Sequence, residues 1–247
     1  AGSTQEGSAL AAGARAAFLL GDLDAVDGLV DRALAVAGAD VRTRHRAWHA
    51  LGVVRLYQGD FDQARRCFET VAGNAGASPA ERLDALGGVA LARCYAGDLA
   101  GAAAAVEQLR GMLVATPSAT YRCFATYVDA EIHLADGQVD AAAALLAEAA
   151  DEAWAVDALF VWGVASTVLA AVLVRHRPPA EARAHLPGLV DRWRRTATWP
   201  QLWTTLRLVA EHLAATGRPE LARLVSTAAD LDASAPTPTG DDADRLV

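Results

Sequence analysis

Residue types that bind metals or carry out catalysis are few in this chain, and His45 and His49 come nearest to a recognisable spacing. Four residues apart on a helix, the two imidazoles would face one side, which is the arrangement that helical zinc sites use. No third ligand accompanies them, because the sequence has neither an HExxH motif nor a cysteine pair nearby. We therefore expect packing or solvated histidines here, and we expect the chain to hold no metal and no cofactor.

The cysteines also give little indication of a chemical role. Cys67, Cys94 and Cys123 are odd in number, widely spaced and flanked by apolar residues, so they predict neither a disulfide framework nor a zinc site. Cys94 and Cys123 could lie side by side, but the expected role of each is that of a buried small hydrophobic side chain. This cysteine usage favours a reducing compartment, so we expect a cytoplasmic location.

The acidic group Asp241, Asp242 and Asp244 is similar to clusters that hold magnesium in some all-helical enzymes. It follows the Pro/Thr-rich segment Ala233–Gly240, so we expect a solvated tail with at most one short helical turn. No G-x-S-x-G elbow supports a Ser-His-Asp set. The phosphate-binding motif G-x4-G-K-[ST] is missing, and the chain contains no lysine at all. We therefore expect no enzyme activity and no nucleotide hydrolysis.

The net charge of −8 disfavours direct nucleic-acid binding, because phosphate contacts need a basic surface. Residues 158–174 form an uncharged span of 17 residues, just short of the length that crosses a bilayer. This span falls in register with a repeat, so we expect a buried helix and no membrane partner. The first ten residues lack the basic segment of a signal peptide.

Charge is unevenly divided along the second half of the chain. Residues 123–174 hold eight acids and no arginine, whereas residues 175–195 hold six arginines and two acids. Ordinary solvated faces, paired between neighbouring elements, would explain this division. A two-signed surface that docks another domain or a second subunit would also explain it. Both interpretations stay open, and a homodimer stays open with them.

The elements that must position these residues follow a repeat, which is the main signal in the sequence. Six tight turns each separate an apolar helix from a second helix, and their first residues lie 38, 38, 40, 40 and 40 residues apart. Glycine can end the first helix in the left-handed conformation, and Asp or Pro can begin the second. The turns are Gly21-Asp22-Leu23, Gly59-Asp60-Phe61, Gly97-Asp98-Leu99, Gly137-Gln138-Val139, Arg177-Pro178-Pro179 and Gly217-Arg218-Pro219.

The repeat predicts twelve helices in six antiparallel pairs over residues 1–232, followed by a tail over residues 233–247. A mostly small residue stands five positions after each turn begins and lets the two helices approach: Val26, Ala64, Ala102, Ala142, Ala182 and Ala222. Boundaries between pairs are expected near Gly38–Asp40, Gly76–Pro79, Pro117, Asp157 and Thr196–Pro200. Pro187 and Gly188 are expected to kink or break the second helix of the fifth pair.

Repeat 2 carries a family resemblance. It contains Trp48-x-x-Leu51-Gly52, then Gly59-Asp60-Phe61, Ala64, Phe68 and Val71. This resembles the tetratricopeptide (TPR) repeat, in which W-x2-L-G precedes a G-D turn, with A and F at those offsets. The period exceeds the usual 34 residues, so longer helices or bigger loops are expected. The resemblance implies an all-α fold, a right-handed α-α superhelix of about six helix pairs. It also implies that five side chains pack together inside repeat 2: Trp48, Leu51, Phe61, Ala64 and Phe68.

A second resemblance covers the last fifty residues and rests on Trp199, Gln201–Arg207, Ala228–Asp230 and Ser234–Pro236. The segment is similar to the C-terminal end of large actinobacterial transcriptional regulators of the LuxR type and the antibiotic-regulator type. In those proteins an ATPase module and a DNA-binding domain are joined to a long TPR-like region. This chain shows neither the ATPase motif nor an evident helix-turn-helix, so the resemblance implies the sensory or scaffold part alone.

Certain positions on the first helix of each TPR pair line the concave face and bind partners. Carried over on the resemblance, they are Arg46, His49 and Tyr57 in repeat 2, Asp84 and Tyr95 in repeat 3, Tyr127 and Glu131 in repeat 4, and Thr204, Arg207 and Glu211 in repeat 6. TPR domains that clamp a C-terminal carboxylate use Lys and Asn at such positions. This sequence lacks both there, so that mode of binding is not expected.

Tryptophans supply a second candidate surface. Five of the six lie in the last hundred residues: Trp154, Trp162, Trp193, Trp199 and Trp203. They indicate either a well-packed core or a groove rimmed by indoles that suits a peptide or an apolar ligand. The candidate partner-binding residues are therefore Arg46, His49, Tyr57, Tyr95, Tyr127, Glu131, Trp199, Trp203 and Arg207.

The favoured interpretation is a non-enzymatic interaction or sensor domain from a transcriptional regulator. Its partner would be a protein, a peptide, a small-molecule effector or another domain of the same regulator. The alternative is an all-helical enzyme with its site in the concave groove, which would show a convergent cluster of perturbed titratable groups.

Overall fold

Glycine turns divide the chain into helix pairs. In the computed structural model, which describes residues 4–36 and 40–238, five of the six expected turns contain a glycine with φ between +76° and +83°: Gly21, Gly59, Gly97, Gly137 and Gly217. Asp22, Asp60 and Asp98 then cap the following helices through side-chain hydrogen bonds from backbone N–H groups. At the remaining turn Arg177 is extended and prolines begin the next helix.

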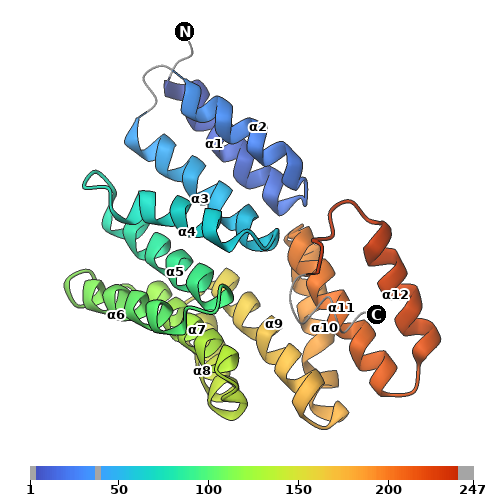
Figure 1. Cartoon of the computed structure of the whole chain (residues 1–247). Helices are drawn as coiled ribbons and strands as arrows, with labels where there is room; N and C mark the ends of the chain where they lie inside the picture. Colours follow the sequence, from blue (N-terminus) through green and yellow to red (C-terminus); the bar gives the residue numbers. More distant parts are fainter. Residues whose placement is uncertain (1–3, 37–39, 239–247) are drawn as a thin grey trace.

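The described residues form twelve α-helices and no β-strand, which confirms the predicted all-α fold (Figure 1). Each odd-numbered helix is the first of a pair and each even-numbered helix is the second. The helices are α1 (Thr4–Leu19), α2 (Leu23–Ala35), α3 (Val41–Tyr57), α4 (Phe61–Ala72), α5 (Pro79–Tyr95), α6 (Leu99–Ala115), α7 (Ala119–Ala135), α8 (Val139–Ala155), α9 (Leu159–His176), α10 (Pro179–Arg195), α11 (Trp199–Ala215) and α12 (Pro219–Leu231).

Small side chains line the seam inside every pair. The residues five positions after each turn start are 7% exposed or less: Val26, Ala64, Ala102, Ala142, Ala182 and Ala222. Seven positions before each turn start stands another buried small residue: Ala14, Gly52, Ala90, Ala130, Ala170 and Ala210. Because neither row carries a bulky side chain, the two helices of a pair can approach closely.

Aromatic rings bridge the pairs, and here the prediction for repeat 2 is partly wrong. Phe68 of α4 lies between Gly52 of α3 and Gly88 of α5, where an added Cβ would stand 2.8 Å and 2.7 Å from its ring. Ala64 and Phe68 therefore belong to the core shared with repeat 3. Trp48 and Leu51 belong instead to the core shared with repeat 1. Phe61 packs against Tyr95, with ring centroids 5.7 Å apart.

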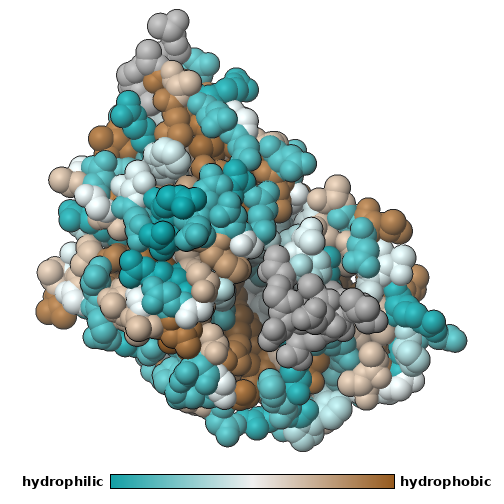
Figure 2. Space-filling view, in the orientation of Figure 1, coloured by the Kyte–Doolittle hydropathy of each residue, from teal (hydrophilic) through white to brown (hydrophobic). Residues whose placement is uncertain are grey.

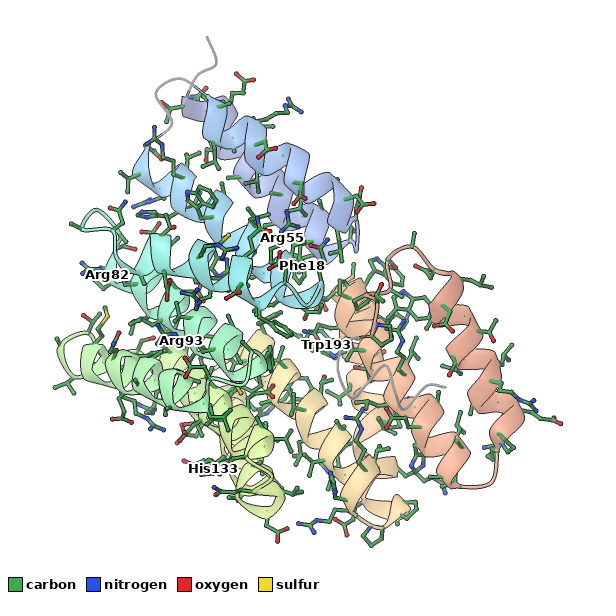
Figure 3. The ribbon with its side chains drawn as sticks, viewed as in Figure 1. Phe18, Arg55, Arg82, Arg93, His133 and Trp193 are labelled. Atoms are coloured by element: carbon green, nitrogen blue, oxygen red, sulfur yellow. The ribbon has the colours of Figure 1, made fainter. Side chains whose placement is uncertain are left out.

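Arginines at one repeated position tie the second pair to the first and the third pair to the second. Arg55 on α3 donates to both carboxylate oxygens of Asp27 on α2 at 2.8 Å. Arg93 on α5, four residues before its turn as Arg55 is, donates to Glu69 on α4 at 3.1 Å. His133 takes the same place in repeat 4 and bonds within its own turn to Gln138 (Figure 3). The stacking of these pairs is thus fixed by ion pairs as well as by apolar contacts.

The six pairs stack into a curved solenoid whose two ends meet. Each first helix packs against the first helix of the next pair, and α11 also touches α1 (Figure 1). At this closing contact Gln201 of α11 donates to the Tyr57 hydroxyl at the end of α3. Phe18 of α1 meets the Tyr57 ring edge-on, with centroids 5.1 Å apart. The contact of α11 with α1 therefore closes the curve of the solenoid.

Helices α9 and α10 bear on the expectations about membranes and helix breaks. Among the described residues, α9 is the helix long and apolar enough to cross a membrane, and half of that span is buried against its neighbours. α10 runs unbroken from Pro179 to Arg195 with Pro187 inside it, so the predicted break does not occur. The three cysteines, Cys67, Cys94 and Cys123, are buried free thiols, as expected. The acidic group 241–244 lies outside the described residues.

Candidate functional site

The first helices of consecutive pairs pack against one another, and we call the surface that they present together the inner face. Its candidate residues in repeats 2 to 4 are Arg46, His49, Asp84, Tyr95, Tyr127 and Glu131. Figure 2 shows a recessed strip of hydrophobic surface beside α7 and α9, bordered by hydrophilic residues. The inner face therefore has a hydrophobic floor and polar side chains along its edges.

His49 and Asp84 form the polar link between α3 and α5. His49 Nε2 lies 2.8 Å from Asp84 Oδ2, and the two side chains keep 27% and 39% of their surface exposed. The imidazole also meets the Phe68 ring edge-on, with centroids 5.6 Å apart. Burial opposes ionisation of Asp84, but the charge and hydrogen bond of His49, with a smaller contribution from Arg15, lower the pKa of the carboxyl below its usual value. The pair is thus a charged, partly accessible feature of the inner face.

Arg46 stands beside this pair, three residues before His49 on α3, and its side chain is exposed. Arg15, which sequence reasoning missed, brings a second positive charge close to Asp84. A signal for Arg15 exists, because it stands six residues before its turn, as the candidate residue Glu131 does. Arg15, His49 and Asp84 therefore lie close together at one end of the inner face, and Arg46 precedes His49 by one helical turn on α3.

Glu131 accepts hydrogen bonds from two tyrosines and joins α5 to α7. Tyr95 Oη donates to Glu131 Oε1 at 3.1 Å, and Tyr127 Oη donates to the same oxygen at 2.7 Å. Burial, reinforced by the charge of Glu131, raises the pKa of both tyrosines well above the ordinary value. Both hydroxyls therefore stay protonated and act as donors.

The exposed fraction differs strongly between Tyr95 and the other two residues of this group. Tyr95 keeps 40% of its surface, whereas Tyr127 and Glu131 keep only 6% and 7%. The expectation that Tyr127 and Glu131 present accessible side chains is wrong, because α7 is packed between α5 and α9 and the Tyr127 ring stacks on Phe124. Tyr95 is accessible because it is the last residue of α5.

Tyr57, Trp199, Trp203 and Arg207 lie at the closing end of the solenoid. Tyr57 is half-buried between Phe18 and Gln201, and burial raises the pKa of its hydroxyl. Trp199 is half-buried against the main core. Arg207 is only 9% exposed, so the expectation that it offers an accessible side chain is also wrong.

Trp203 and Arg207 contact the chain's own C-terminal segment. Trp203 Nε1 donates to Ser234 Oγ at 2.9 Å, and Arg207 Nη1 donates to the Pro236 carbonyl at 2.6 Å. The other two candidate positions in repeat 6 make internal contacts: Thr204 donates to the Pro200 carbonyl, and Glu211 accepts from Arg175 of α9 at 2.8 Å. The structure thus separates the candidate residues into two groups, one on the inner face of repeats 2 to 4 and one at the closing end, which is formed by α11 and Tyr57.

The oppositely charged repeats 4 and 5 are linked by an ion pair between Asp140 and Arg177. Trp154 near the end of α8 and Phe160 at the start of α9 remain 62% and 49% exposed, while Trp193 is fully buried. The tryptophans of the second half are therefore divided between core and surface. Within residues 4–36 and 40–238, no three metal-ligating side chains come together in a group that could hold an ion.

Two surface hollows lie away from the candidate residues. One, of about 530 Å³, is lined by residues of α10 and α11, and the other, of about 720 Å³, is lined by residues of α4, α5 and α6 and of the turn after α4. None of the nine predicted partner-binding residues lines either hollow.

Comparisons with known proteins identify no family for this chain. No protein-family model matches the sequence, and no curated protein matches it either. Two crystal structures of a Podosopora anserina putative kinesin light chain with nearly identical TPR-like repeats are similar at 20% identity. The first covers 75% of this chain and 92% of its own, with a TM-score of 0.48, and the second covers 74% and 92%, with a TM-score of 0.47. By its own helices and turns, the described chain is a TPR-like helical-repeat solenoid.

Proposed function

We propose that this chain is a non-enzymatic interaction domain that binds an extended protein segment along the inner face of repeats 2 and 3. The observation that carries the proposal is the accessible set Arg46, His49, Asp84 and Tyr95 on two successive first helices. Arginine and tyrosine supply much of the binding energy at protein interfaces, because they combine large contact area with hydrogen bonding. Asp84 and His49 add charge that orients a partner.

The spacing of these residues favours an extended partner. Arg46 and Asp84 occupy the same position of repeats 2 and 3, thirteen residues before the turn. Tyr57 and Tyr95 likewise share a position two residues before the turn. Equivalent positions recur once per stacked pair, so a ligand that contacts several of them must run across the helices. A segment of another protein fits this geometry better than a small molecule, which would contact a single repeat.

The chemistry of the inner face supports binding rather than catalysis. Cys94 is the thiol that lies near Glu131. Burial raises the pKa of Cys94 to about 12, and the negative charge of Glu131 also raises it. A thiol with that pKa is protonated at neutral pH and is a poor nucleophile. The His49–Asp84 pair and the Glu131 group are each satisfied within the fold.

The cellular setting is proposed from the second sequence resemblance. The chain would be the C-terminal part of a cytoplasmic transcriptional regulator of the LuxR type, and its partner another domain of that regulator or a separate protein. It would contact no DNA directly, given the net charge of −8. An ATPase module and a DNA-binding domain encoded in the same reading frame would support this setting. A reading frame with neither would contradict it.

The binding proposal is tested with a peptide selected on the protein itself. A library of random twelve-residue peptides is displayed, panned against the intact chain, and one binder is titrated calorimetrically. Arg46→Ala, Asp84→Ala and Tyr95→Ala should each weaken it by about tenfold, the loss expected at a binding hot spot. Arg66→Ala, at an exposed position of α4, is the matched control and should leave the affinity unchanged. Equal affinities for all four variants would refute the site.

A further inference from the structure

The chain's own C-terminal segment, residues 232–238, lies against a surface built from both ends of the solenoid. We call this surface the closing site and define it by Trp203 and Arg207 of α11 and by Gly21 of the α1–α2 turn. Figure 1 shows the segment, drawn in red after α12, passing between the start of α11 and the α1–α2 turn. Residues that are more than two hundred positions apart in the sequence therefore meet here.

The segment is held as a bound peptide would be, through a side-chain hydrogen bond, a main-chain hydrogen bond and a buried proline ring. Trp203 Nε1 donates to the Ser234 hydroxyl at 2.9 Å. The Ser234 hydroxyl in turn donates to the Asp232 carboxylate, which also accepts from the Ser234 backbone N–H at 2.9 Å. Arg207 Nη1 donates to the Pro236 carbonyl at 2.6 Å, and the Pro236 side chain is buried. One side-chain group, one main-chain carbonyl and one buried ring are thus recognised separately.

Gly21 allows the segment to approach the α1–α2 turn closely. A Cβ added at Gly21 would stand 2.6 Å from Ser234 Cα, closer than real Cβ contacts allow. The φ of Gly21 is +79°, so the turn and the close approach both require glycine. Any larger residue at position 21 would push the segment away from Trp203 and Arg207.

We propose that the closing site is a recognition site for an extended Ser-x-Pro segment, and that residues 232–238 are its resident occupant, displaced when a partner protein presents a segment of the same chemistry. The occupant competes at a high effective concentration because it is tethered, so a partner segment binds weakly until the tail is released. The closing site is separate from the inner face of repeats 2 and 3, so either proposal can fail without the other.

The test uses the intact chain and a fluorescein-labelled peptide with the sequence of residues 232–238, DASAPTP. The tail variant Ser234→Glu/Pro236→Gly removes the recognised hydroxyl and the buried ring, while Trp203, Arg207 and Gly21 stay intact. Thr237→Glu, at an exposed position of the same segment, is the matched control. Binding is followed by fluorescence anisotropy, with melting temperatures measured for every variant.

The peptide should bind the tail variant about tenfold or more tightly than the unmodified chain or the Thr237→Glu control, because the tethered competitor is gone. Adding Trp203→Phe, which keeps an aromatic ring but removes the N–H donor, should weaken that binding by about fivefold. A peptide with Glu in place of Ser should not bind. Equal binding to the tail variant and the unmodified chain, or no binding to either, would overturn the proposal and make the segment a structural cap of repeat 6.

Hydrogen exchange gives a second readout that needs no bulky substitution. Excess unlabelled DASAPTP added to the unmodified chain should speed amide exchange in residues 232–238, since the free peptide replaces the tethered segment. Exchange in α4, which is remote from the closing site, should not change. Unchanged exchange in the segment, at a peptide concentration that saturates the tail variant, would also overturn the proposal.

Discussion

Phe68 of α4 rests on Gly52 of α3, so closely that a Cβ at position 52 would stand 2.8 Å from the ring. Gly88 of α5 lies on the other side of the same ring, and a Cβ added at position 88 would stand 2.7 Å from the ring atoms. One aromatic side chain therefore fixes the spacing of three helices. Glycine is present at both contacts because no larger residue would leave room for the ring.

Gly52→Ala should destabilise the fold despite the better intrinsic helix propensity of alanine. The added methyl group has to displace Phe68, and overpacking of this kind costs roughly 1–3 kcal/mol. Urea unfolding followed by circular dichroism measures the change. Gly111→Ala in α6 is the matched control, because an added Cβ there meets nothing within 4 Å. The control should gain about 1 kcal/mol or less. A stability gain in both variants would contradict the packing described for Phe68.

Ala64→Leu tests the seam inside repeat 2. Ala64 is fully buried, so the larger side chain should force α3 and α4 apart and cost roughly 1–3 kcal/mol. Ala103→Leu, at an exposed position of α6, is the corresponding control and should change stability by less than about 0.5 kcal/mol. An unchanged melting temperature for Ala64→Leu would show that the repeat register is wrong.

Asp84 should make stability depend on pH in the acid range. Its pKa in the folded chain lies below the usual value, with burial outweighed by His49. The carboxylate therefore contributes stability above about pH 4, the unfolded pKa, and loses it as pH falls through the lower folded pKa. Asp84→Asn should show a shallower fall in unfolding free energy between about pH 5 and pH 2. Parallel pH curves for the two proteins would contradict the His49–Asp84 contact.

The cysteines should be unreactive in the folded chain. All three are buried, and burial raises the pKa of Cys67 to about 11 and that of Cys94 to about 12. Only a thiolate attacks a disulfide reagent at an appreciable rate. With Ellman's reagent at about pH 8, we expect slow reaction of the native protein and rapid reaction of all three thiols in guanidinium chloride. Rapid native labelling of even one cysteine would argue against the buried packing.

The sequence carried enough information to predict the helices and turns, because glycine, Asp caps and small seam residues act locally. Gly59 and Asp60 end α3 and cap α4 wherever the pair is placed. Similar turn residues then recur once per pair along the chain. The division of Trp48 and Phe68 between two cores could not be predicted, because it depends on which neighbouring pair each ring meets.

Exposure at the inner face also depended on tertiary structure. The TPR resemblance assigns Tyr95 and Tyr127 alike to the concave side, yet the first is 40% exposed and the second 6%. The difference arises because Tyr95 ends its helix, whereas Tyr127 lies in the middle of α7 beneath its neighbours. The closure of α11 onto α1 depends on the summed rotation of five repeat steps, and a single repeat does not reveal that sum.

Photo-cross-linking tests most directly the central claim that the inner face of repeats 2 and 3 is the partner surface. The photoreactive amino acid benzoylphenylalanine is placed at position 46 on α3, and in a control protein at position 66 on α4. Each protein is irradiated with the display-selected peptide, and the cross-linked product is quantified by mass spectrometry. We expect a strong cross-link from position 46 and none from position 66. Cross-linking from position 66 alone would place the partner on the outer helices and contradict the claim.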